Sequence, residues 1–163
     1  MSVQQSFVDY LKKIQNYHEA ISVIYWDMRT GAPKKGLEQR SQVIGTLSSE
    51  AFALSTADEL GQMLEQLEQE ELDFVTRRLY EETKKDYELS KKIPPDVYKE
   101  FVIAQSQAEA AWEQAKAEDN FELFLPHLEK LIDYTKQFVG YWGVKNGSVY
   151  NTLLDRYEPE MTT

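Results

Sequence analysis

The sequence has no cysteine and only two histidines, His18 and His127, among its 163 residues. Disulfide bonds, zinc fingers and thiol catalysis are therefore excluded within the chain. Catalytic zinc usually takes three protein ligands, and a helical H-E-x-x-H motif supplies two of them from one face. His18-Glu19 begins that motif, but Ser22 stands where the second histidine is required. We therefore predict no catalytic residue and no metal ligand on this chain, and substrate-binding residues stay unassigned.

Long apolar runs and positive charge are also scarce. No run approaches the roughly 18 to 20 apolar residues that a membrane-spanning helix needs, and the first ten residues show no secretory signal. The chain carries 18 Lys and Arg against 28 Asp and Glu, a formal net charge of −10. Nucleic-acid phosphates and anionic membrane surfaces would repel such a chain. We expect a cytoplasmic protein that binds neither nucleic acid nor membrane.

The residues that are present predict an all-α fold. Apolar residues recur every three or four positions, which is typical of amphipathic helices, and no strand-like alternation occurs. We expect about six helices, packed as antiparallel hairpins in a single domain over residues 1–163. The main expected helices are 2–28, 37–54, 56–67, 72–91, 94–118 and 126–142, and a short one follows at 149–154.

Two of these helices, 94–118 and 126–142, form the predicted central antiparallel pair, joined at the break Asp119-Asn120. Small residues on the apolar stripe of the first helix let a neighbour approach closely. Trp112 is the large residue among them, so we expect its ring to fill the core.

Two sequences predict capping boxes at helix starts, Thr56–Glu59 and Asp119–Glu122, and Asn146-Gly147 predicts a turn. The stretch between Ser41 and Thr76 contains acids but no Lys or Arg, whereas the following helix is rich in both. We interpret these segments as two separately solvated faces, and their pairing as antiparallel neighbours is the alternative.

Trp26-Asp27 is the most distinctive polar-aromatic pair. Asp27 follows a nearly all-apolar turn, Ile21–Trp26, which we expect to be buried from several sides. Asp27, with Arg29 nearby, is predicted to form a structural ion pair, and a catalytic role is the alternative. Arg40 lies on an apolar stripe, which indicates an ion pair or a side chain that extends its charged end to solvent.

Several stretches resemble one family in chain order. They are Tyr25-Trp26-Asp27, Thr30–Pro33, Arg40 with Leu47, Ser106–Ala108, Ala111-Trp112, Asn120-Phe121, Phe124, Pro126–Leu128, Tyr150, Leu153–Asp155, Tyr157–Pro159 and Thr162. On these residues the sequence resembles the N-terminal region of the carboxypeptidase Taq family, the M32 metallocarboxypeptidases. Asn151 stands where that family commonly has an acid, and Glu160 where it commonly has glycine.

The resemblance implies a zinc-dependent, cytoplasmic carboxypeptidase, usually a homodimer, that removes C-terminal residues from peptide substrates. It also implies a larger helical fold with a deep groove, as in neurolysin-like peptidases. The family's H-E-x-x-H and its third glutamate ligand lie beyond the region matched. The resemblance therefore predicts an inactive N-terminal fragment that walls the groove.

The alternative is a free-standing helical interaction module without enzymatic activity. For a fragment, we expect exposed apolar side chains at Ile21–Trp26 and among the aromatic residues from Tyr134 to Trp142, and hence self-association.

Overall fold

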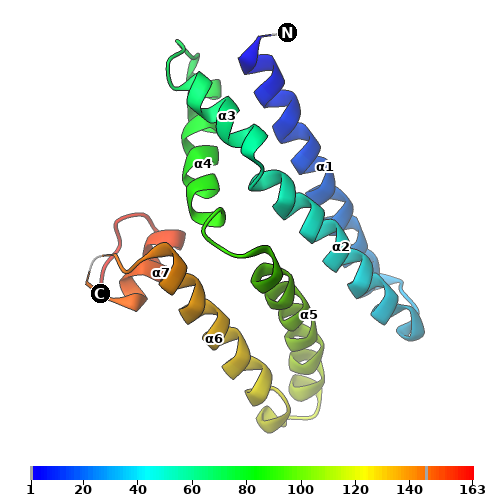
Figure 1. Ribbon diagram of the computed structural model, residues 1–163. Coiled ribbons are helices and arrows are strands. Elements are labelled where there is room, and N and C mark those ends of the chain that lie inside the picture. The colour runs from blue at the N-terminus through cyan, green and yellow to red at the C-terminus, as the bar shows by residue number, and fades with distance from the viewer. Residues whose placement is uncertain (1, 146) are drawn as a thin grey trace. The chain divides into compact units, whose positions relative to one another are not determined.

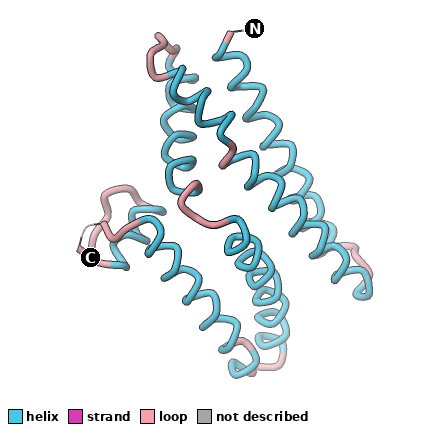
Figure 2. Tube along the Cα trace, viewed as in Figure 1, coloured by secondary structure: helices cyan, strands magenta, loops and turns pink. Residues whose placement is uncertain are grey.

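The computed structural model describes residues 2–145 and 147–163, and its regular elements are all helical (Figure 1 and Figure 2). The helices in these residues are α1 Val3–Thr30, α2 Leu37–Ser55, α3 Asp58–Leu67, α4 Phe74–Ser90, α5 Pro95–Ala117, α6 Leu125–Trp142 and α7 Val149–Tyr157. Short 3-10 turns precede α2 (η1, Lys34–Gly36) and α6 (η2, Phe121–Leu123). The prediction of an all-α fold is confirmed.

The predicted turn at Asn146-Gly147 falls partly outside the described residues, because Asn146 is not among them. Gly147 itself has a φ of 77°, a backbone conformation that favours glycine. Among the described helices, none combines the length and the apolar character needed to cross a membrane.

The chain divides into two compact units, Met1–Lys99 and Glu100–Thr163. Helix α5 runs across the division, so its first turn belongs to the first unit. The prediction of one domain over residues 1–163 stays a prediction.

The core of the first unit lies where α1 packs against α3 and α4. Phe7 is fully buried at its centre, and its neighbours on α1 follow at intervals of three and four residues, which keeps them on one face. The buried cluster consists of Phe7, Tyr10, Ile14, Leu60, Leu64, Leu67 and Tyr80. Helix α2 runs along α1 as the second arm of an antiparallel hairpin (Figure 1).

The second unit contains the predicted hairpin of α5 and α6. The ring of Phe101 on α5 meets the rings of Tyr134 and Phe138 on α6 edge-on, with centroids 5.9 and 4.9 Å apart. These aromatic contacts join two antiparallel helices (Figure 1). The predicted antiparallel pairing of these two helices is therefore confirmed.

The expected core position of Trp112 is wrong, because its side chain is 43% exposed. The buried residues of α5 are the small ones, Ala104, Ala108 and Ala115. At 100° per residue, Trp112 points about 60° away from the centre of that stripe. Its ring instead lies under the ammonium of Lys116, 5.0 Å from the ring centroid.

The capping box expected at Thr56–Glu59 does not form. The N-cap of α3 is Ala57, which makes no side-chain cap. The hydroxyl of Thr56 instead donates to the carbonyl of Phe52, 2.9 Å away and one turn back on α2. Ser and Thr hydroxyls commonly take this local alternative.

The box expected at Asp119–Glu122 is also wrong, because this segment ends α5 rather than starting α6. Asp119 has a φ of 51°, and the amide of Asn120 donates to the carbonyl of Ala115 at 2.9 Å. A left-handed residue followed by such a bond is a common helix C-terminus, in which Asn or Asp can replace glycine.

Candidate functional site

An ion pair joins the last turn of α1 to the first turn of α2. Arg40 Nε donates to Asp27 Oδ2 at 2.5 Å, and Arg40 Nη1 donates to the carbonyl of Gly36 at 3.3 Å. A Cβ atom on Gly36 would collide with the guanidinium group, so glycine suits this position. The predicted ion pair of Arg40 is confirmed, and Asp27 is its partner. Both side chains keep solvent contact, so the pair contributes about 0 to 1 kcal/mol to stability.

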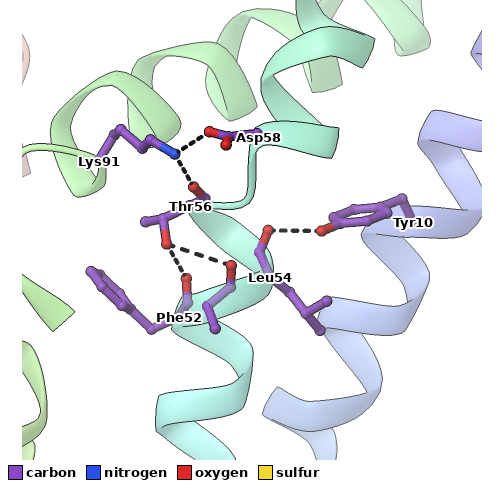
Figure 3. Close-up of polar contacts among 7 residues, drawn as sticks. Tyr10, Phe52, Leu54, Thr56, Asp58 and Lys91 are labelled. Atoms are coloured by element: carbon purple, nitrogen blue, oxygen red, sulfur yellow. Dashed lines mark hydrogen bonds and ion pairs between the residues drawn. The ribbon is translucent and has the colours of Figure 1, made fainter.

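A second polar cluster surrounds the joint between α2 and α3 (Figure 3). The hydroxyl of Tyr10 on α1 donates to the carbonyl of Leu54 at 3.0 Å. Lys91 Nζ, at the end of α4, donates to the carbonyl of Thr56 at 2.6 Å and to Asp58 Oδ1 at 2.7 Å. The joint is thereby linked to α1 through Tyr10 and to the end of α4 through Lys91.

The protonation of these groups follows from their surroundings. Burial raises the pKa of the Tyr10 phenol, and the negative charge of Glu59 raises it further. The hydrogen bond and charge of Lys91 lower the pKa of Asp58, and the reciprocal bond raises the pKa of Lys91. The joint therefore holds a neutral phenol and an ionised Lys–Asp pair at neutral pH.

The acidic segment and the basic helix do pair, so the alternative interpretation of the charge pattern holds rather than that of two separately solvated faces. Besides Lys91 with Asp58, Lys84 Nζ contacts Glu68 Oε1 at 2.8 Å, so two ion pairs link α4 to α3. A Cβ atom on Gly61 of α3 would collide with the hydroxyl of Tyr87 of α4. The missing side chain at Gly61 thus lets the two helices approach.

Many large apolar side chains are exposed in the described residues. In the first unit they are Val23, Trp26, Val43, Phe74, Val75 and Leu79, and in the second unit Ile103, Trp112, Phe121, Leu123, Ile132, Val144, Val149, Tyr150, Tyr157 and Met161. Val23 and Trp26 are 63% and 72% exposed, which confirms exposed apolar side chains at Ile21–Trp26. The expectation that this turn is buried from several sides is wrong, because one face of α1 is left uncovered within the first unit.

The aromatic residues from Tyr134 to Trp142 are not a main part of that exposed surface. Phe138 is buried, and its ring packs on Phe101 and also lies 5.9 Å from the ring of Trp142. That half of the expectation is wrong, because the α5–α6 hairpin covers these rings itself.

The two histidines lie on different helices, His18 on α1 and His127 on α6. Within residues 2–145 and 147–163, no three His, Cys, Asp or Glu side chains gather closely enough to hold a metal ion. The residues described here do not fit a catalytic metal. The absence of a zinc site stays a prediction that binding measurements must test.

Residues 6–163 match the family described as carboxypeptidase Taq (M32) metallopeptidase. The chain belongs to the M32 family. It is 44% identical over 161 residues to Carboxypeptidase 1 of Bacillus subtilis, and the matched region covers 98% of this chain and 32% of that protein. It is 31% identical over 163 residues to Thermostable carboxypeptidase 1 of Pyrococcus furiosus, and this match covers 99% of this chain and 32% of that protein. The chain spans about a third of the length of these M32 relatives.

Solved structures agree with the M32 assignment. The crystal structure of BsuCP matches with a TM-score of 0.93 at 43% identity, over 99% of this chain and 33% of the other. The structure of Pyrococcus furiosus carboxypeptidase, described as Apo-Mg, matches with a TM-score of 0.80 at 29% identity, over 99% and 32%. The resemblance seen in the sequence is confirmed, and so is the helical fold it implies.

The two departures from the usual M32 pattern flank α7: Asn151 lies in its first turn and Glu160 lies just beyond its end. Asn151 is buried, its amide donates to Ser148 Oγ at 2.9 Å, and its Oδ1 accepts the amide of Thr163 at 3.1 Å. Glu160 has a φ of 69°, in the left-handed region that favours glycine. A residue other than glycine is strained in this conformation.

Proposed function

We propose that this chain is the N-terminal helical part of a zinc-dependent metallocarboxypeptidase that removes C-terminal amino acids from peptides. The observation that carries the proposal is the continuous M32 match over residues 6–163, with a TM-score of 0.93 to one third of BsuCP. Because the described residues do not fit a metal, we assign the metal and its ligands to the remaining two thirds of the parent enzyme. Alone, the chain is inactive.

The contribution of this part is shape. Helices α1 and α2 pack along one another as an antiparallel hairpin, with Asp27 and Arg40 paired at one end, and such a hairpin can form one wall of a groove. A wall restricts how a peptide enters and helps to exclude water from the reacting end. The exposed apolar side chains on this wall, Trp26 among them, meet either the peptide or the rest of the parent.

Residues that act by shape give a specific kinetic signature. In an enzyme that includes this chain, Trp26→Ala should raise KM or alter the preferred peptide length, with little change in kcat. Lys13→Ala is the matched control, because it changes an exposed polar residue of the same helix. If Trp26→Ala instead lowered kcat and left KM unchanged, the groove-wall role would be wrong at that position.

The assignment to a larger enzyme extends to its setting. We propose a cytoplasmic homodimer that acts on peptides, as the M32 resemblance implies. The isolated chain should release no amino acid from a blocked dipeptide, with or without added zinc. Cleavage by the isolated chain that persists in the presence of a chelator would contradict this proposal. A stable monomer that fails to restore activity to a truncated relative would favour the free-standing module.

A further inference from the structure

Three residues in the connection from α4 to α5 and in the first turn of α5 contact the first unit, Met1–Lys99, or are buried within it. Lys91 binds the joint between α2 and α3. Ile93 is 8% exposed. The ring of Tyr98 stacks on the ring of Phe52 of α2, with centroids 3.9 Å apart and an interplanar angle of 12°. Burial raises the pKa of the Tyr98 phenol, which agrees with its position between helices.

The Lys91 contact differs from the other two in its chemistry. Its ammonium lies between the carbonyl of Thr56, at the negative end of α2, and the carboxylate of Asp58, in the first turn of α3 (Figure 3). A cation at a helix C-terminus and an acid in a first turn are both favourable. The side chains of Lys91 and Asp58 are 43% and 87% exposed, so solvent and ions reach this contact directly.

The backbone hydrogen bonds of the connection are local. The amides of Lys91 and Lys92 donate to the carbonyls of Tyr87 and Leu89, 2.9 and 3.3 Å away. Pro94 and Pro95 have no N–H group to donate. The amide of Ile93 donates to the carbonyl of Ser90 at 3.0 Å, and the amide of Tyr98 donates to the carbonyl of Pro94 at 3.0 Å. These local bonds shape the turn itself, whereas the side chains of Lys91 and Tyr98 join the segment to the helices before it.

We propose that Lys91 is a clasp that holds the α4–α5 connection on the α2–α3 joint, and that its release loosens the start of α5. The core cluster around Phe7 includes neither Lys91 nor the connection, so release leaves that core folded. Any change that removes the charge of Lys91, or that screens it, acts on the same contact. The fold thus contains a charge-dependent hinge just before the second unit begins. This inference does not rest on the proposed function.

Amide hydrogen exchange on the 163-residue chain tests the clasp, read by NMR at Ile93 and Tyr98. Lys91→Gln should speed exchange at both amides by about threefold to tenfold, because local opening costs less once a charge-assisted contact is lost. Lys84→Gln is the matched control: it removes the Lys84–Glu68 ion pair on the same helix but leaves the connection alone. The amide of Gly143, bonded to Val139 in the second unit, is the internal reference.

Two outcomes would overturn the clasp. One is equal exchange at Ile93 and Tyr98 in the Lys91→Gln and Lys84→Gln variants. The other is acceleration of all amides together, Gly143 included, which would indicate global destabilisation. If Lys91→Gln fails to fold, Asp58→Asn serves as the second variant, because it removes the charge from the exposed side of the contact. It should speed the same two amides, and unchanged exchange in this variant would count against the clasp.

Discussion

Phe7 offers the sharpest test of where the core lies. Its side chain is 0% exposed and lies at the centre of a cluster drawn from α1, α3 and α4. Truncating such a phenylalanine removes its transfer free energy and leaves a cavity, so Phe7→Ala should cost about 3 to 5 kcal/mol. That is a large share of the 5 to 15 kcal/mol by which domains are typically stable.

Trp112 provides the control, because it is the residue that pattern alone assigns to the core. Its side chain is 43% exposed and its ring contacts Lys116. Trp112→Ala should therefore cost roughly 1 to 2 kcal/mol, from partial burial and an exposed cation–π contact. The larger side chain should thus give the smaller loss.

Urea unfolding followed by circular dichroism measures both costs. The midpoint should fall much further for Phe7→Ala than for Trp112→Ala, with similar slopes for the two variants. A loss for Trp112→Ala that equals or exceeds that of Phe7→Ala would refute the placement of the core on α1, α3 and α4.

Three further predictions follow from single positions. In urea unfolding, the Gly61→Ala variant should be at least about 1 kcal/mol less stable than the Gly45→Ala variant. A Cβ atom at position 61 collides with Tyr87, whereas a Cβ atom at position 45 meets nothing within 4 Å and alanine there adds helix propensity. Glu160→Gly should raise stability by about 1 kcal/mol, since φ is 69° there, and a lower melting temperature would contradict the strain. Hydrogen bonds from the hydroxyl and amide of Thr76 lower the pKa of Asp73 in the folded chain. The stability that the Asp73 carboxylate contributes is therefore fully present above about pH 4, the ordinary aspartate pKa, and is lost as the pH falls through the lowered folded-state pKa. Melting temperatures should therefore drop less steeply below pH 4 in Asp73→Ala than in the unchanged chain, and identical slopes would argue against this cap.

Local periodicity predicts most of the fold because it depends on residues within one or two turns. The stripes on 94–118 and 126–142 lead directly to the α5–α6 hairpin, whereas the charge contrast between α3 and α4 leaves their ion pairs only as an alternative to two solvated faces. The pattern is less reliable for a residue at the edge of a stripe. Trp112 lies there, and its exposure depends on which helix faces α5.

Contacts distant in sequence were beyond the reach of the pattern. Lys91 reaches the carbonyl of Thr56, 35 positions away, and no spacing rule connects a lysine at a helix end to a carbonyl on another helix. The sequence also predicts a cap from Thr56 here, whereas its hydroxyl bonds to the carbonyl of Phe52 instead. Arg40 was found from its position on an apolar stripe, but its partner Asp27 required the structure.

The central claim is that this chain can serve as the N-terminal third of an M32 carboxypeptidase. The direct measurement replaces the matching third of Bacillus subtilis Carboxypeptidase 1, to which it is 44% identical, with residues 1–163. Release of the C-terminal amino acid from a blocked dipeptide is then assayed, with and without chelator. The account predicts chelator-sensitive release by the chimera, and none by the chain alone or by the truncated relative. A well-folded chimera without activity, or a truncated relative that is fully active without this chain, would contradict it.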